Sequence, residues 1–477
     1  MDKLLLEGLT FDDVLVVPMR SKVLFENICL KTRLVGDIFL NAPLISSPMD
    51  TVTEARMAIA VARQGGIGII HKNMSIEEQA QEVDKVKRSE FGVITNPFSL
   101  GPNQYVYEAI ELMARYRISG IPITEYDTLV GIVTNRDLRF ESDTNKKIYE
   151  VMTRKEALVT APVGTTLEEA KAILDQKKIE KLPIVDENGD LKGLITTKDI
   201  AKSIAYPNSA KDERGSLLVG AAVDASEDTL DRIGELVKKK VDIIVLDITY
   251  AHTEEAIYTL KNIKKEYPGI KVMAGNVCTK EATIELIEAG ADAVRVGIGP
   301  GSVCATGAIA GVGMPQITAI MECAKAAAKY NIPIIADGGI KHSGDIVKAL
   351  VAGANAVMIG NLFAGCDQSP GDVDLYQGRK YKQYNSKIKK AISCQKLGSK
   401  LTMPEGVEAR VVYKGNVIDV IQEIVSGLRT GMVYTGSDNI EHLRENGRFV
   451  KISKAGHAES LPHSIHVTKD ATNYTTI

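Results

Sequence analysis

The 477-residue sequence contains no tryptophan, only 5% aromatic residues in total, and a net charge of just −3 at pH 7. The shortage of aromatic rings argues against a base-stacking platform for single-stranded nucleic acid. The small net charge gives no signature of polyanion binding. We therefore expect no nucleic-acid partner.

Cysteine is also scarce, and its spacing is irregular. The six cysteines are Cys29, Cys278, Cys304, Cys323, Cys366 and Cys394, and no two of them form a CxxC motif. This scatter argues against a zinc site or a disulfide framework and suits a reducing cytosol.

Long apolar runs are missing, and the sequence starts MDKLLLEGLTFDDV, with acidic residues beside a short apolar patch. This start has the features of neither a signal peptide nor a basic transit peptide. We expect a cytoplasmic protein with no membrane partner, and the length suggests two or three domains.

What the sequence does contain is a series of short, continuous apolar runs. They lie at 42–47, 65–70, 217–223, 241–248, 271–277, 291–299, 332–339 and 354–361. Such runs are typical of parallel strands buried on both faces. Helical patterns that end in glycine, such as 279–290 and 343–353, separate the later runs. The pattern predicts an α/β protein with a (β/α)8 TIM barrel, and an open doubly wound sheet is the alternative.

An internal repeat interrupts this spacing. Residues 105–138 and 166–200 each read as a helix, a strand after Ile-Pro or Leu-Pro, a turn, and a strand ending GIVTNRD or GLITTKD. The repeat resembles a tandem pair of CBS domains. We expect a barrel from 1–92 and 206–477, CBS domain 1 at 93–150 and CBS domain 2 at 151–205.

The CBS resemblance implies a regulatory site for adenine or guanine nucleotides. It assigns ribose contacts to the threonine and aspartate that end each repeat, namely Thr134, Asp137, Thr196 and Asp199. A purely structural insertion that binds nothing is the alternative.

Two expected strands end in glycine turns suited to a phosphate. The seventh ends in DGGIKHSGD, with Asp337, Gly338 and Gly339, and the eighth ends in MIGNLFAG, with Gly360 and Asn361. Phosphates in TIM barrels favour the loops after these two strands, where bare backbone amides can converge. The pair of turns predicts a phosphorylated ligand.

The stretch GIGPGSVCATGAIAGVGMPQ, residues 297–316, follows the sixth expected strand and places Cys304 on the same rim. A thiol beside backbone amides can act as a covalent nucleophile, and Thr306 could position a water or a leaving group. A glycine-rich turn with a buried, inert cysteine is the alternative.

The sequence resembles the inosine monophosphate (IMP) dehydrogenase family, of which GMP reductase is the nearest relative. The motifs are GLTFDDVLVVP (8–18), SSPMDTVTEARMAIAVARQGGIGIIHKN (46–73), AGNV (274–277), GIGPGSVC (297–304), GVGMPQITAI (311–320), ADGGIKHSGD (336–345) and LRTGMVYTG (428–436). They cover nearly the whole chain, the CBS insertion included.

The resemblance implies a reaction and a set of roles. Cys304 would attack C2 of IMP, hydride would pass to NAD, and hydrolysis would release xanthosine monophosphate (XMP), with Thr306 and Glu405 also catalytic. The implied substrate-binding residues are Ser47, Met49, Ser302, Asp337, Gly338, Gly339, Gly360, Asn361, Tyr384 and Glu405. Those implied for NAD are Asp247, Thr249, Asn276, Gly297 and Gly299, and those for potassium are Gly299, Gly301 and Cys304. A homotetramer or octamer is also implied.

Some positions depart from the family pattern. Its Thr-Thr-Arg after the cysteine is Ala305, Thr306 and Gly307 here, Asn361 replaces a usual serine, and 247–252 reads DITYAH instead of Asp-Thr-Ala-His-Gly-His. Segment 385–403 is shortened and lacks the Arg-Tyr pair whose arginine activates the hydrolytic water in the family. Three hypotheses therefore stay open: an IMP dehydrogenase with an altered flap, a GMP reductase, and a nucleotide-binding regulatory subunit.

Overall fold

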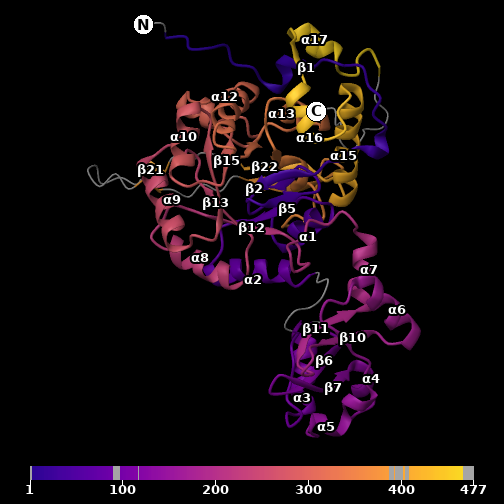
Figure 1. Ribbon diagram of the computed structural model, residues 1–477. Helices are drawn as coiled ribbons and strands as arrows, with labels where there is room; N and C mark the ends of the chain where they lie inside the picture. Colours follow the sequence, from indigo (N-terminus) through magenta and orange to yellow (C-terminus); the bar gives the residue numbers. More distant parts are fainter. Residues whose placement is uncertain are drawn as a thin grey trace. The chain divides into compact units, whose positions relative to one another are not determined.

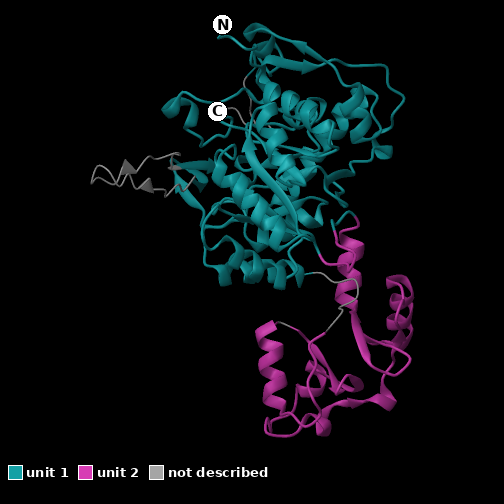
Figure 2. Cartoon of the chain, turned by 60° about the vertical axis from the view of Figure 1, so that its left-hand side comes forward, with its two compact units in different colours: residues 1–89, 208–210, 217–477 teal, residues 90–207, 211–216 magenta. Residues whose placement is uncertain are grey.

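The computed structural model of the chain describes residues 3–89, 97–116, 118–385, 391–392, 401–402 and 408–465. Two compact units make up the chain (Figure 2). The first comprises residues 1–89, 208–210 and 217–477, and the second comprises residues 90–207 and 211–216.

The first unit is built on a closed barrel of eight parallel strands, joined in the order β12-β13-β14-β15-β16-β17-β4-β5. The strands are β4 (Leu44–Ser46), β5 (Ile67–Ile70), β12 (Val219–Val223), β13 (Ile243–Asp247), β14 (Lys271–Val277), β15 (Ala293–Val296), β16 (Ile334–Asp337) and β17 (Ala356–Ile359). Each strand falls within one of the apolar runs. Because the strands close into a barrel, the prediction of a TIM barrel is confirmed and the alternative prediction of an open doubly wound sheet is wrong.

The barrel is filled from inside and covered from outside. Its interior holds apolar side chains, among them Ile69, Ile243, Met273 and Met358, all almost fully buried. The alternate side chains of the same strands point outward and pack against the helices. Burial on both faces explains why the strands read as continuous apolar runs.

Helices follow the strands and cover the outside of the barrel, and Figure 1 shows α8, α9, α10 and α12 in succession around it. The principal helices are α1 (Ala55–Arg63), α2 (Ile76–Lys87), α8 (Thr229–Lys238), α9 (Glu254–Glu266), α10 (Lys280–Glu288), α12 (Gln316–Ala328), α13 (Ser343–Val351) and α15 (Val417–Thr435). Side chains cap several of them, as Ser75 does for α2 and Thr279 for α10. Two short helices are α11 (Thr306–Ala310), the next element after β15, and α14 (Asn361–Ala364), which begins two residues after the end of β17.

Smaller elements flank the barrel. The antiparallel sheet β18-β19-β22 joins Asp374–Tyr376, Arg379–Asn385 and Glu408–Val412, and β1 (Val14–Val16) pairs with β23 (Phe449–Lys451). Further pairs are β2 (Thr32–Val35) with β3 (Ile38–Leu40) and β20 (Ala391–Ile392) with β21 (Leu401–Thr402). The remaining elements are η1 (Phe11–Asp13), η2 (Phe25–Asn27), α16 (Ile440–Asn446) and α17 (Lys454–Glu459).

The second unit contains both copies of the repeat, and each copy has a hydrophobic core of its own. The first copy comprises α3 (Val106–Tyr116), β6 (Gly120–Glu125), β7 (Thr128–Thr134), α4 (Asn135–Leu138), α5 (Ile148–Val151) and β8 (Thr153–Arg154). The second comprises η3 (Lys155–Ala157), β9 (Ala161–Pro162), α6 (Leu167–Lys177), β10 (Lys181–Val185), β11 (Leu191–Thr196) and α7 (Thr197–Ala205). Each repeat therefore forms the predicted helix and hairpin. Among the described residues of the chain, none of the helices combines the length and apolar character that a membrane span requires.

The close fit of the barrel interior yields a prediction about stability. A Cβ at Gly220 would lie 2.6 Å from Ile69 Cδ1 and 2.7 Å from Ile243 Cγ1. Gly220→Ala therefore overpacks the barrel and should cost about 1–3 kcal/mol, and Ile243→Ala should cost about 2–5 kcal/mol by leaving a cavity. In urea unfolding, the double variant should lose less stability than the sum of the two single-variant losses, because Ile243→Ala removes one of the two clashes. Additive losses would contradict this packing.

Candidate active site at the carboxyl end of the barrel

A buried arginine organises the carboxyl end of the barrel. Arg295 lies in β15 and is only 3% exposed. Its guanidinium forms an ion pair with Asp247 at the end of β13, donates to the Asn276 side chain in β14, and lies 3.6 Å from Asp337 Oδ2 at the end of β16. One cation thus connects four neighbouring strands.

The two carboxylates respond differently to this environment. Burial alone would raise the pKa of Asp247, but Arg295 and Lys72 outweigh it, so that pKa lies below its usual value. Burial raises the pKa of Asp337, and the attraction of Arg295 together with the Asn276 hydrogen bond offsets only part of that increase. Lys72 also lies 3.2 Å from Asp224 Oδ2, so it bridges two acidic strand ends.

Asn276 is committed to holding its neighbours. Its Nδ2 donates to Asp337 Oδ2 at 2.9 Å and to the Gly297 carbonyl at 2.8 Å, while its Oδ1 accepts from Arg295. The side chain therefore orients the Asp337 carboxylate from within the barrel.

The cysteine loop begins where β15 ends. The Cys304 amide donates to the Gly301 carbonyl at 3.0 Å, and Cys304 Sγ lies 3.3 Å from Thr306 Oγ1, in the first residue of α11. Cys304 and Thr306 are both partly exposed, so a ligand on the rim can reach the thiol. The partial exposure argues against a buried cysteine, and the role of nucleophile stays a prediction.

The turn after β16 touches the cysteine loop. A Cβ at Gly338 would lie 3.1 Å from Pro300 Cγ, and one at Gly339 would lie 3.3 Å from Pro300 Cβ. The two loops that carry the predicted nucleophile and the predicted phosphate amides are therefore packed together.

The turn after β17 is equally close to its neighbours. A Cβ at Gly360 would lie 2.7 Å from the Tyr384 hydroxyl and 3.3 Å from Met49 Sδ, so a larger residue would displace one of them. The Ser47 amide donates to the Ile359 carbonyl at 3.0 Å, just before this turn. Tyr384 is 4% exposed, and its burial, with the nearby Asp337 charge, raises the pKa of its hydroxyl. The tyrosine therefore stays neutral.

The structure brings most of the predicted site residues to this end of the barrel. The residues that adjoin one another there are Ser47, Met49, Asp247, Asn276, Gly297, Gly301, Cys304, Thr306, Asp337, Gly338, Gly339, Gly360 and Tyr384. Gly299 and Ser302 lie in the cysteine loop, Asn361 starts α14, and Thr249 is exposed after β13. Glu405 lies outside the described residues. The second unit holds the Thr134–Asp137 and Thr196–Asp199 pairs, whose side chains are joined at 2.7 Å and 2.5 Å.

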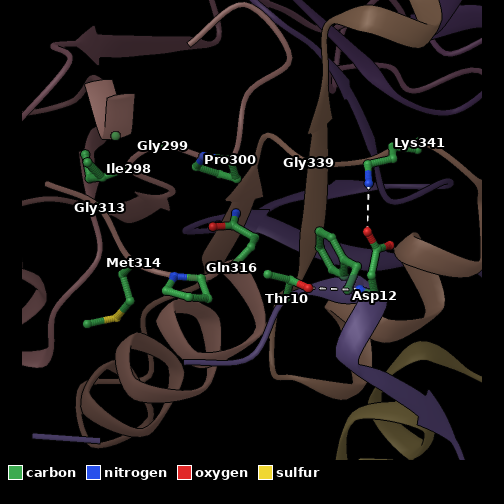
Figure 3. Close-up of a pocket in the computed structure, with 13 residues that line it drawn as sticks. Thr10, Asp12, Ile298, Gly299, Pro300, Gly313, Met314, Gln316, Gly339 and Lys341 are labelled. Atoms are coloured by element: carbon green, nitrogen blue, oxygen red, sulfur yellow. Dashed lines mark hydrogen bonds and ion pairs between the residues drawn. The ribbon is translucent and has the colours of Figure 1, made fainter. Parts of the chain in front are cut away.

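A cavity of about 330 Å³ lies beside the site (Figure 3). Thr10, Asp12, Gly299, Met314, Gln316 and Lys341 are among its lining residues, and Asp12 and Lys341 form a 2.9 Å ion pair at one side. Neither Cys304 nor Asp337 lines this cavity, so it is adjacent to the predicted chemistry and does not contain it.

Comparison with known proteins agrees with this geometry. The sequence model of the IMP dehydrogenase / GMP reductase domain matches residues 8–463. The chain is 56% identical to inosine-5'-monophosphate dehydrogenase of Halalkalibacterium halodurans and 55% identical to that of Bacillus subtilis, over 98% of each chain in both cases. The chain belongs to the IMP dehydrogenase / GMP reductase family.

Solved structures of this family share the whole fold. GMP reductase from Trypanosoma brucei, solved as a cysteine-to-alanine variant with guanosine 5'-monophosphate, superposes with a TM-score of 0.86 at 37% identity. The match covers 97% of this chain and 99% of the other. A second structure of that enzyme, with guanosine 5'-triphosphate, gives a TM-score of 0.78 at 34% identity, covering 94% of this chain and 98% of the other.

Sequence reasoning missed three residues that shape this family member's site: Arg295, Lys72 and Gln316. Arg295 left a signal, because a charged residue inside the apolar run 291–299 needs a buried partner. Lys72 and Gln316 left none, since their partners lie on strands distant in the sequence.

Removing Arg295 should destabilise the protein in a pH-dependent way. Arg295→Met leaves the Asp247 and Asp337 carboxylates without this cation. The pKa of Asp337, already raised by burial, then rises further, and the pKa of Asp247 rises as well although Lys72 still lowers it. An acid with a raised folded pKa loses stability as pH rises, so the loss should be larger at pH 8, about 3–5 kcal/mol, than at pH 5.

Thermal unfolding of the variant and the unmutated protein at both pH values measures this difference. Arg88→Met is a matched control, because it breaks a surface pair with Asp84 and should cost at most about 1 kcal/mol at either pH. An equal loss at pH 5 and pH 8 for Arg295→Met would contradict the assignment.

Proposed function

We propose that this chain is an NAD-dependent IMP dehydrogenase that oxidises IMP to XMP through a covalent bond to Cys304. The observation that carries the proposal is the contact between the cysteine loop, at Pro300, and the glycine turn at Gly338 and Gly339. This contact supports a site in which the Cys304 thiol would lie near the backbone amides that would bind a nucleotide phosphate. The family membership supports the oxidoreductase class.

The nucleotide would lie across the ends of β15, β16 and β17. Asp337, oriented by Asn276, would accept hydrogen bonds from the ribose diol. Amides at Gly338, Gly339 and Asn361 would hold the 5′-phosphate, together with Ser302. Ser47, Met49 and Tyr384 would form the wall of the purine pocket, since Met49 and Tyr384 already close around Gly360.

The chemistry would use the Cys304–Thr306 pair. The Cys304 thiolate adds to C2 of the purine, and departure of hydride from C2 leaves a thioimidate between sulfur and carbon. Water then adds to C2, the C–S bond breaks, and XMP leaves as the thiolate is regenerated. Thr306, 3.3 Å from the sulfur, would stabilise the thiolate and orient the water. Glu405 is proposed as a further catalytic and substrate-contacting residue.

The rim also fits a dinucleotide. Tyr250 is 48% exposed just after β13, and its ring lies against that of His252 with the ring centroids 6.2 Å apart. The two rings meet edge-on at 70°, which leaves the exposed Tyr250 ring, close in sequence to Asp247 and Thr249, as the surface on which an aromatic ring of NAD would stack. NAD would supply the hydride acceptor when bound. Gly297, Gly299 and Asn276 complete the proposed NAD side.

A monovalent cation suits the cysteine loop. Carbonyl oxygens are the ligands that potassium prefers, and we assign those of Gly299, Gly301 and Cys304 to it. The Gly301 carbonyl accepts one hydrogen bond, from the Cys304 amide, and keeps a second lone pair for a cation. Among the described residues, no cluster of His, Cys, Asp or Glu side chains forms an alternative metal site.

GMP reductase is the second candidate function. The GMP reductase of T. brucei matches this chain end to end, so the inserted repeats do not argue against a reductase. In that reaction the thiolate displaces ammonia from C2 of GMP, and hydride delivered from NADPH to C2 then releases IMP. No water adds, so the Gly307 and 385–403 departures would matter less.

We assign the second unit as a regulatory CBS pair, with domains at 93–150 and 151–205 inserted into a barrel of 1–92 and 206–477. Thr134 with Asp137 and Thr196 with Asp199 are proposed to contact the ribose of adenine or guanine nucleotides. We further propose a homotetramer or octamer acting in the cytoplasm.

The two candidate functions are separated by spectrophotometry at 340 nm. A dehydrogenase should produce NADH from IMP and NAD⁺, with XMP as the product on chromatography. NADPH consumption with GMP, and no NADH from IMP, would replace the first proposal with the second. No turnover in either assay would leave the regulatory-subunit hypothesis.

Cys304 should be indispensable for either reaction. Cys304→Ala should lower kcat by at least about 10³-fold, because it removes the nucleophile, while the Kd for the nucleotide changes little. Cys29→Ala, at an exposed cysteine away from the rim, is the control and should retain full activity. Intact mass spectrometry of unmutated protein with IMP and NAD⁺ should show a nucleotide adduct that Cys304→Ala lacks. Turnover by Cys304→Ala would refute the covalent route.

A further inference from the structure

Gln316, the first residue of α12, connects two strands of the barrel. It is 2% exposed, and its Nε2 donates to the Val296 carbonyl at 2.9 Å and to the Asp337 carbonyl at 3.0 Å. Both partners can only accept, so the orientation of the carboxamide is determined by its neighbours. Figure 3 shows this side chain between Pro300 and Met314.

The two carbonyls belong to the last residues of β15 and β16. The backbone pairing of these strands ends with Val296 opposite Ala336. The cysteine loop starts at Gly297, directly after β15, and the glycine turn starts at Gly338, directly after β16. Gln316 therefore joins the strands at the point where their own ladder stops.

Gly297 allows this junction to be tight. Its φ is +151°, and a Cβ there would lie 2.0 Å from the Asp337 carbonyl oxygen and 3.1 Å from Gln316 Nε2. Only glycine lets the cysteine loop leave β15 at this distance from β16.

The carboxamide carries a cost that a purely space-filling residue would avoid. Gln316 Oε1 is buried and accepts no hydrogen bond within the part of the chain that the structure describes. A methionine would fill a similar volume without leaving a buried acceptor unpaired. The two donated hydrogen bonds are what distinguish glutamine from methionine here.

We propose that Gln316 is a positioning residue for the reaction: it sets the distance between the Cys304 loop and the Asp337–Gly339 turn, and so between the nucleophile and the bound nucleotide. The inference rests on the proposed function. Over the described ranges of the chain, the only predicted nucleotide-contacting residue to which the Gln316 side chain donates a hydrogen bond is Asp337, at its main-chain carbonyl, and it donates none to Cys304.

Three variants test the role. Gln316→Met removes both hydrogen bonds at similar volume. Gln316→Glu offers a donor only when its carboxyl is protonated. The ionised carboxylate has no hydrogen to donate, and it faces two carbonyl oxygens that can only accept. Thr318→Val is the matched control, since Thr318 lies in the same helix and its hydroxyl accepts a part-buried hydrogen bond from the Leu9 amide, away from β15 and β16.

Gln316→Met should lower kcat about 10–100-fold, because displacement of a reacting group by about 1 Å costs that much. The nucleotide Kd should change less than about threefold, since the substitution moves the Asp337–Gly339 turn relative to the Cys304 loop but leaves its amides and the Gly360 turn available to the nucleotide. Relative to unmutated protein, Gln316→Glu should recover activity as pH falls from 8 to 6. Thr318→Val should keep kcat within about twofold.

A kcat for Gln316→Met within twofold of the unmutated value, or an equal loss in Thr318→Val, would overturn the proposal. A pH profile of Gln316→Glu parallel to that of the unmutated protein would do the same. If unmutated protein shows no turnover with IMP or GMP but IMP still protects Cys304 from iodoacetamide, the proposed function fails. The positioning role then stands if Gln316→Met weakens that protection at saturating IMP and falls if it does not. Absence of protection in the unmutated protein would refute both.

Discussion

The placement of Arg295 inside the mouth of the barrel is the interaction on which the site depends. A guanidinium at 3% exposure is tolerated only with partners, and Asp247, Asn276 and Asp337 supply them from three other strands. The same contacts fix the side chains that face the ligand. The hydrogen bonds and ion pairs that a buried guanidinium requires therefore hold Asp247, Asn276 and Asp337 in fixed orientations at the carboxyl end of the barrel.

This cluster links two regions with different tasks. Asp247, beside Lys72, belongs to the side where we place the dinucleotide, and Asp337 belongs to the side where we place the ribose. Their pKa values are moved in opposite directions because Asp247 has two cations close by and Asp337 shares one. Arg295 is therefore the cation that the two sides of the rim share.

The chain also shows how one scaffold can serve two related reactions. In both proposed reactions the thiol, the nucleotide turns and the orienting network would have the same roles, whether hydride leaves C2 or arrives there. Of the departures in this sequence, the family resemblance links the one at 385–403 to the step in which water is added, and it links the one at 247–252 to the dinucleotide side. The high identity to IMP dehydrogenases favours oxidation, while the full-length likeness to a GMP reductase structure keeps reduction as the competing candidate.

The sequence alone determined the barrel, its inserted repeats, the strand order along the chain and the family. Continuous apolar runs and glycine-rich turns carry that information locally, because apolar residues indicate strands buried on both faces and glycines indicate turns with accessible backbone amides. Lys72 and Gln316 could not be found in this way. A lysine before an asparagine, or a glutamine after a proline, becomes a bridge only when the closed barrel brings Asp224, Asp247, Val296 and Asp337 within reach. Closure of the barrel decided which polar side chains meet, since their partners are distant in sequence and adjacent only in space.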